Sequence, residues 1–179
     1  MDTRDLGRRP GSMRQLTRTV PAPADLGTGV IGVPAGSDVH LDIRCESVVE
    51  GVLVTATARV RVEGECVRCL DPVASSAEVA VQELYYYPDQ DVDDEEAERL
   101  EGDLLDLEPA LRDSVVLALP LQPLCRDDCP GLCPSCGVRL ADDPGHRHDV
   151  ADPRWAALGA LRPEHDPLHD PTDDEMEGG

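Results

Sequence analysis

Polar and apolar residues alternate along the first half of the chain. The apolar positions of DVHLDIRCE are Val39, Leu41, Ile43 and Cys45. This two-residue period is typical of a strand with one buried face. After a turn at Glu50-Gly51 the alternation continues over 52–62, and a third strand-like run covers 73–84. The pattern predicts an antiparallel sheet, with Cys45 as a core residue on its buried face.

A helical spacing follows the strands. Apolar residues recur at intervals of three and four at Leu104, Leu107, Leu111, Val115 and Ala118. Asp106 and Pro109 are typical of a helix start, and Pro120 ends the segment. The stretch ADPRWAALGALRP repeats this pattern, with Asp152 as cap and Trp155 on the apolar face. We therefore predict an α+β fold, an antiparallel β-sheet with one or two packed helices.

The chain length and the segment boundaries together indicate one principal domain. A chain of 179 residues buries one ordinary core. We expect an Arg-rich N-terminal arm and connector at 1–27 and a single β-rich domain at 28–163. Within that domain lie an acidic insertion at 89–103 and a Cys-rich zinc segment at 125–148. An acidic tail at 164–179 completes the prediction.

Charge is distributed unevenly along the chain. Residues 89–108 hold eleven acids against Arg99, and residues 164–177 hold seven acids, so the two runs carry 17 of the 21 net negative charges. We expect the insertion and the tail to be solvated and mobile. The first eighteen residues contain five arginines that are candidate contacts for RNA phosphates or an acidic partner: Arg4, Arg8, Arg9, Arg14 and Arg18. A flexible terminus without such contacts is the alternative.

The compartment affects how the seven cysteines are interpreted. The chain has neither an apolar run long enough to span a membrane nor the pattern of a signal peptide, so we expect a cytoplasmic protein without a membrane partner. A reducing cytosol disfavours disulfides, and a dense cysteine cluster there indicates metal binding or catalysis. A redox pair would need a thioredoxin-like βαβ context, and the spacings match no usual ferredoxin pattern.

The segment CRDDCPGLCPSCG and a second pair in GECVRCL supply a set of zinc ligands. The tight turn of a Cys-x-x-Cys pair points both sulfurs at one ion. Cys133 and Cys136 form such a pair, and His146 and His148 follow at a distance that can close a four-ligand site. The remaining ligands are Cys125 and Cys129 with Cys66 and Cys69, the last two at the tip between two paired strands. This scheme predicts two structural zinc ions.

Two other pairings remain open at this stage. One is a single site made of Cys125, Cys129, Cys133 and Cys136. The other is a single site that joins Cys66 and Cys69 to Cys133 and Cys136. In either case His146 and His148 would be exposed loop histidines. This interpretation stays open because His-x-His is a less specific signal of metal binding than Cys-x-x-Cys.

Three motifs together resemble the bacterial large ribosomal RNA subunit accumulation protein family, YceD. They are LGRRPGSM near the start, GECVRCL, and PLCRDDCPGLCPSCG followed by a DPRW segment. The arm is similar to that of high-GC Gram-positive members. The resemblance places Cys66 and Cys69 at the family's first pair and Cys125, Cys129, Cys133 and Cys136 at its later cluster. Members often end that cluster in Cys-x-Cys, where this chain has His146-Arg147-His148; zinc accepts either ligand.

The resemblance implies a role in the synthesis, processing or stability of 23S ribosomal RNA, and thus in making the large ribosomal subunit, with ribosomal RNA or a pre-ribosomal particle as partner. It implies no known enzymatic activity. A second hypothesis is an adaptor whose acidic segments bind basic ribosomal proteins. A third is a metal-dependent nuclease that uses the acids of 89–108, which is disfavoured because catalytic carboxylates need fixed positions and an open metal site.

Overall fold

The computed structural model describes residues 1–92, 97–148 and 154. The chain divides into two compact units, Met1–Pro144 and Gly145–Gly179. The first unit contains all the named strands and helices. Apart from Arg154, the predicted second helix from Asp152 onward lies outside the described residues, and so do the acidic tail at 164–179 and residues 93–96 of the acidic insertion.

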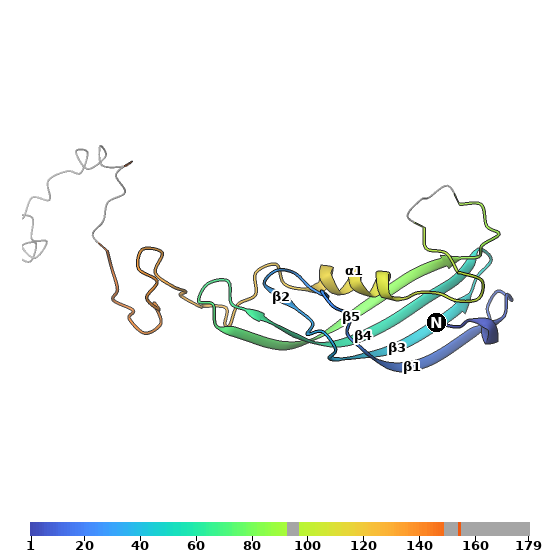
Figure 1. Ribbon diagram of the computed structural model, residues 1–179, viewed down its shortest axis with the longest axis horizontal. Coiled ribbons are helices and arrows are strands. Elements are labelled where there is room, and N and C mark those ends of the chain that lie inside the picture. The colour runs from blue at the N-terminus through green and yellow to red at the C-terminus, as the bar shows by residue number, and fades with distance from the viewer. Residues whose placement is uncertain (93–96, 149–153, 155–179) are drawn as a thin grey trace, which may run out of the picture. The chain divides into compact units, whose positions relative to one another are not determined.

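Five antiparallel strands form one sheet in the first unit (Figure 1). The strands are β1 (Met13–Pro21), β2 (Ile31–Gly32), β3 (Asp38–Ser47), β4 (Gly51–Glu65) and β5 (Pro72–Tyr86). The order is β1-β3-β4-β2, and β5 pairs with the other edge of β4. The longest pairing runs from Gly51 opposite Tyr86 to Glu65 opposite Pro72. The three strands predicted from alternation are therefore confirmed, and they are consecutive neighbours in the sheet.

The buried face of the sheet follows the sequence alternation. On β3 and β4 every second residue is buried: Val39, Leu41, Ile43, Cys45, Val52, Val54, Ala56, Ala58, Val60 and Val62. Cys45 is 3% exposed, which confirms it as a core residue. Tyr85 and Tyr87 at the end of β5 are also buried, and the Tyr87 hydroxyl lies 2.9 Å from the Ser47 hydroxyl. The opposite face is polar and exposed.

One α-helix covers the apolar face in the described part of the chain. Helix α1 (Glu108–Ala118) packs against β5 and buries Ala110, Leu111 and Val115 (Figure 1). Asp106 contributes to the helix start as expected, since its Oδ1 accepts the Glu108 N–H at 3.0 Å. Leu104 does not continue the helical face; it lies in a turn before the helix and is 53% exposed.

The N-terminal segment contains a strand that the sequence did not predict. β1 lies at the sheet edge, pairing with β3 from Met13 opposite Glu46 to Pro21 opposite Asp38. An edge strand is accessible on most sides, so none of its residues is fully buried and its alternation is weak. Ahead of it, the 3-10 helix η1 (Arg4–Leu6) follows Thr3, whose N–H donates to Asp103 O at 2.9 Å. Residues 1–21 thus pair with the body instead of extending from it as an arm.

Candidate metal centre

The turn between β4 and β5 forms the first cysteine hairpin, residues 66–71. It is closed by the Cys66 N–H to Asp71 O bond at 2.8 Å and the Leu70 N–H to Cys66 O bond at 2.9 Å. Leu70 has a φ of 62°, the left-handed conformation that such a tight turn requires. This geometry points the sulfurs of Cys66 and Cys69 to the same side of the turn.

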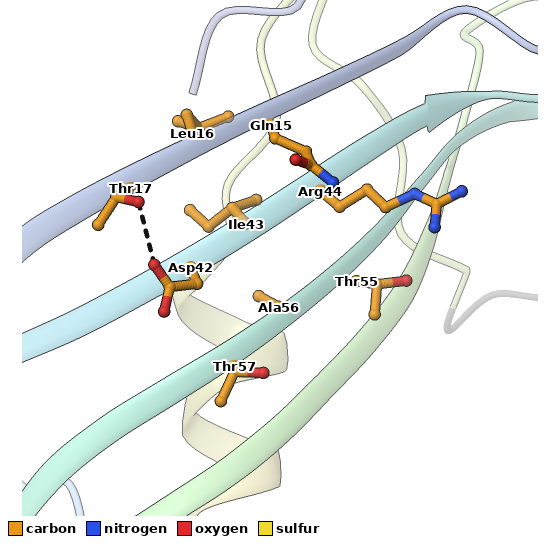
Figure 2. A pocket seen from close by; sticks show the side chains of 9 residues that line it. All are labelled: Gln15, Leu16, Thr17, Asp42, Ile43, Arg44, Thr55, Ala56 and Thr57. Carbon is orange, nitrogen blue, oxygen red and sulfur yellow. Dashed lines mark hydrogen bonds between the residues drawn. The ribbon is translucent and has the colours of Figure 1, made fainter.

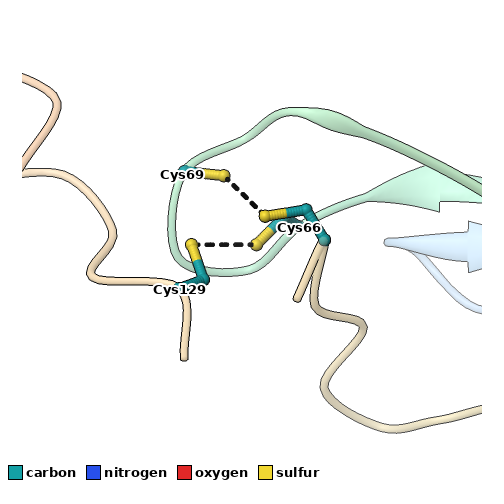
Figure 3. Close-up of side chains that lie close together, drawn as sticks. Cys66, Cys69 and Cys129 are labelled. Carbon is teal, nitrogen blue, oxygen red and sulfur yellow. Dashed lines mark hydrogen bonds between the residues drawn. The ribbon is translucent and has the colours of Figure 1, made fainter. Parts of the chain in front are cut away.

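The chain after α1 returns to this hairpin and brings two more cysteines to it (Figure 1). The Val67 N–H donates to Pro123 O at 2.9 Å, and Arg68 Nη1 donates to Cys129 O at 2.9 Å. Two sulfur pairs result, Cys66 with Cys129 at 3.8 Å and Cys69 with Cys125 at 3.6 Å. All four sulfurs lie within 4.8 Å of one another. Figure 3 shows Cys66, Cys69 and Cys129 facing one another across the turn.

These sulfur separations fit a tetrahedral zinc ion. With zinc to sulfur bonds of about 2.3 Å, tetrahedral geometry separates neighbouring sulfurs by about 3.8 Å. The four cysteines supply a complete set of soft ligands with no further donor required. Cys66, Cys69 and Cys129 are buried, while Cys125 is exposed at the rim. We call residues 66–71 together with 123–129 the clasp, because they join the β4–β5 turn to the chain that follows α1.

The thiols of the clasp influence one another's ionisation. Burial raises the pKa of Cys66, but the backbone amides that donate to its sulfur outweigh burial and lower its pKa to about 6. For Cys69, the Asp71 backbone amide lowers the pKa, while burial and the neighbouring sulfurs raise it to about 12. The pKa of Cys125 is also raised. One thiolate forms readily and repels a second, so a bound cation is needed before all four ionise together.

The second predicted set of ligands divides between the two units. In the first unit Cys133 and Cys136 lie on a second cysteine hairpin, residues 132–140, closed by the Cys133 N–H to Val138 O bond at 2.8 Å. In the second unit the Nε2 atoms of His146 and His148 are 2.8 Å apart. Both halves present adjacent donor atoms, as metal binding requires. A metal ion shared by these four residues remains a prediction.

The sequence did not reveal three residues that bind the two hairpins together. Arg139 donates both terminal nitrogens to the Asp71 carboxylate, which holds the pKa of that carboxyl below its usual range. Arg68 bonds to Cys129 as described above, and its own carbonyl accepts the Leu132 N–H at 3.0 Å. Arg139 and Asp71 are 68 positions apart, and no spacing rule connects them. Only the folded chain identifies the pair.

The predicted RNA-contacting arginines mostly have acidic partners. Arg4 pairs with Asp2, and Arg14 pairs with Asp5 at 3.2 Å. Arg8 lies 4.6 Å above the Tyr87 ring and 3.3 Å from Asp89. Arg18 donates to the Thr17 carbonyl, and Arg9 is exposed in the loop before β1. These contacts reduce the positive potential that the segment would present to phosphates.

A shallow hollow of about 540 Å³ lies on the polar face of the sheet, where β1, β3 and β4 run side by side (Figure 2). Its charged and hydroxyl groups bond mainly within the sheet. Asp42 accepts from Thr17 at 3.0 Å and from Arg59 at 2.8 Å, and Arg44 pairs with Glu46 at 2.7 Å. The hollow therefore has neither an excess of one charge nor an array of converging donors.

An antiparallel sheet with four cysteines gathered at its β4–β5 turn places the chain among small β-rich proteins with a candidate structural metal site. The pattern of the family described as large ribosomal RNA subunit accumulation protein YceD matches residues 54–162, so the chain belongs to the YceD family. This match confirms the resemblance inferred from GECVRCL and CPGLCPSCG.

Relatives occur in mycobacteria. Uncharacterized proteins of Mycobacterium tuberculosis and Mycobacterium bovis are 50% identical over 173 residues, covering 94% of this chain and 84% of theirs. One of Mycobacterium leprae is 40% identical over 161 residues, covering 88% of this chain and 74% of its own. These source organisms agree with the high-GC Gram-positive type that the sequence predicts. No solved structure matches the chain. Within the described residues, no helix combines the length and apolar character needed to cross a bilayer.

Proposed function

We propose that this protein is a non-enzymatic zinc-binding factor for the accumulation of 23S ribosomal RNA, acting on its synthesis, processing or stability in the cytoplasm. The clasp is the observation that carries the metal part of the proposal. Four thiolates complete a tetrahedral zinc ion and leave no position for water or substrate, which is typical of structural sites. The family description supplies the link to the large ribosomal subunit.

A second structural zinc ion is part of the proposal, held by Cys133, Cys136, His146 and His148. Two thiolates and two neutral imidazoles form a standard zinc ligand set. The hairpin conformation supports this assignment, because Gly137 has a φ of 73° and its N–H donates to Cys133 O at 2.8 Å. That turn places Cys133 and Cys136 as a Cys-x-x-Cys pair would need.

Depletion and complementation test the proposal. Cells that lack the protein should show less mature 23S RNA relative to 16S RNA, and the wild-type gene should restore the ratio. Cys66→Ser should not restore it, because the clasp would lose one of its four ligands. Cys45→Ala is the matched control, since it alters a buried cysteine outside the clasp and should restore the ratio. An unchanged ratio on depletion, or full rescue by Cys66→Ser, would contradict the proposal.

A protein-binding adaptor is the second candidate, and the ion-paired arginines favour it. With Arg4, Arg8 and Arg14 paired to acids, the N-terminal segment is a weaker phosphate-binding surface than its sequence predicts. The chain's net charge of -21 instead suits basic ribosomal proteins. The test is a pull-down from lysate with and without nuclease. Salt-sensitive binding of basic proteins that survives nuclease favours the adaptor, and its loss favours direct RNA binding.

The nuclease hypothesis receives no support from the described acids. Among residues 89–92 and 97–108, the carboxylates form no group that converges as metal ligands. RNA cleavage by the purified wild-type protein, abolished by alanine at these acids, would revive the hypothesis.

A further inference from the structure

The two cysteine hairpins of the first unit are joined mainly by polar contacts. The central one is between Arg139 on the second hairpin and Asp71 at the end of the first. Arg139 Nη1 lies 2.8 Å from Asp71 Oδ2, and Nη2 contacts Oδ1. Two parallel bonds of this kind fix the orientation of both side chains as well as their separation.

Backbone contacts also join the two hairpins. Arg68 O accepts the Leu132 N–H at 3.0 Å. Gly131 has a φ of 81°, and a Cβ there would lie 3.0 Å from that same carbonyl oxygen. The second hairpin therefore begins in close contact with the first, at a glycine that permits both the approach and the backbone conformation.

Asp71 also touches a candidate metal ligand directly. The Cys69 sulfur lies 3.3 Å from Asp71 Oδ2, the oxygen that Arg139 Nη1 binds. A carboxylate that contacts one ligand of the clasp thus receives the guanidinium of the second hairpin. The guanidinium balances the charge of this carboxylate, so the pair places no net negative charge beside the four-cysteine site.

We propose that the Asp71–Arg139 pair is a latch that couples the two metal sites. A metal ion in the clasp fixes the first hairpin, and the latch then holds the second hairpin in the conformation that presents Cys133 and Cys136 to the second ion. Asp71 and Arg139 are positioning residues that coordinate neither ion. The inference rests on the proposed function in one respect, that both sites bind metal.

Stepwise metal titration of the full chain tests the latch. Metal-free protein is titrated with Co²⁺, whose visible absorption distinguishes four-sulfur from mixed sulfur and nitrogen coordination, and zinc then displaces the cobalt. Cys66→Ser and Cys133→Ser assign the two steps. Asp71→Asn and Arg139→Gln should each weaken the second step about tenfold, the range found when a residue that supports a metal ligand is altered. In Arg139→Gln, which leaves the contact between Cys69 and Asp71 in place, the first step should stay near its wild-type affinity.

The double variant separates a latch from two independent effects. Asp71→Asn with Arg139→Gln should be no weaker at the second step than either single variant, because each change alone already breaks the pair. Amide hydrogen exchange gives a readout that needs no cobalt: the Cys133 N–H should exchange faster in metal-loaded Arg139→Gln than in the wild type.

The matched control is a nearby exposed ion pair, Arg126 with Asp128 at 3.3 Å, which lies in the clasp and spans two residues only. Arg126→Gln and Asp128→Asn should leave both steps unchanged. The latch is overturned if Asp71→Asn and Arg139→Gln behave like these controls, or if Arg139→Gln weakens both steps equally. A wild-type protein that binds one ion also overturns it, and one that binds none contradicts the proposed metal sites themselves.

Discussion

The sheet and the clasp both contain buried cysteines, and a comparison of Cys45 with Cys66 shows what separates a core residue from a candidate metal ligand. In the sheet, Cys45 is 3% exposed, pairs across the strands with Val54, and has a pKa raised by burial. In the clasp, Cys66 is fully buried but lies 3.8 Å from another sulfur, and its pKa is lowered to about 6. Burial is common to both cysteines. Convergence with other sulfurs distinguishes the candidate ligand from the core residue.

The two regions also differ in what can stabilise them. The sheet buries a continuous set of aliphatic side chains from β3, β4, β5 and α1. The clasp has a separate small cluster of Cys66, Cys69 and Cys129, and the hydrophobic side chains packed against it are the partly buried Val73, Leu124 and Leu132. A cluster of this size offers little hydrophobic stabilisation. The sheet should therefore keep its fold without metal, whereas the clasp should depend on it.

The largest expected effect comes from removing a clasp ligand. Cys66→Ser should bind one metal ion fewer and should show rapid amide exchange at 123–129, while exchange at 39–62 in the sheet stays slow. Metal analysis and hydrogen exchange by mass spectrometry provide the two measurements. Cys45→Ala should retain the full metal content. If both variants lost metal equally, the distinction between the two buried cysteines would be wrong.

Truncation of a core side chain in the sheet should lower stability and leave metal content unchanged, the reverse of the effect expected for Cys66→Ser. Val54 is fully buried on β4, and Val54→Ala removes two methyl groups from a packed site. We expect a loss of about 2 kcal/mol in the free energy of unfolding, measured in urea. Metal content should not change, because the β4–β5 turn that carries Cys66 and Cys69 is closed by its own hydrogen bonds. Loss of metal in this variant would show that the clasp depends on the sheet core.

Sequence patterns predicted the sheet interior better than its edge. A two-residue period is visible in β3 and β4 because one face of each strand is buried and the other exposed. β1 has exposed residues at most positions, so its pattern of burial, and hence its sequence signal, is weak. The same weak signal explains why the sequence predicts an arm and connector at 1–27 and not an edge strand within them.

The cysteine pairing was predictable only in part. Spacing identified the Cys-x-x-Cys turns, because a turn is a local feature. Which pairs meet depends on the return of the chain after α1, and three pairings fitted the sequence. The structure brings Cys125 and Cys129 to Cys66 and Cys69. The Asp71–Arg139 contact had no sequence signal, since it depends on how the two hairpins approach each other.

A smaller effect, confined to the sheet, is expected at Tyr85. Its hydroxyl donates to Asp106 O at 2.8 Å, and burial, followed by nearby acidic groups, raises the pKa of the phenol above its usual value near 10. Tyr85→Phe should cost about 1 kcal/mol at pH 8 through the lost hydrogen bond.

The cost of Tyr85→Phe should fall as pH rises above 10. The folded state favours the neutral phenol, so this stabilisation is complete below the unfolded-state pKa and decreases as pH rises toward the folded-state pKa. Urea unfolding of both proteins at pH 8 and pH 10.5 measures the difference. A cost that did not depend on pH would contradict the role given to burial.

The smallest effect is expected on the polar face of the sheet. Arg59 bonds to Asp42 at 2.8 Å and to Glu78 at 2.9 Å, and it is 54% exposed. Water and salt screen such pairs, so Arg59→Gln should change the melting temperature less than any variant above, and less at high salt than at low salt. Metal content should be that of the wild type. Thermal unfolding at two salt concentrations measures this effect. A large loss of melting temperature that did not depend on salt would contradict the expectation. It would mean that the Arg59 side chain stabilises the sheet through packing, as a core residue does, and not through charge.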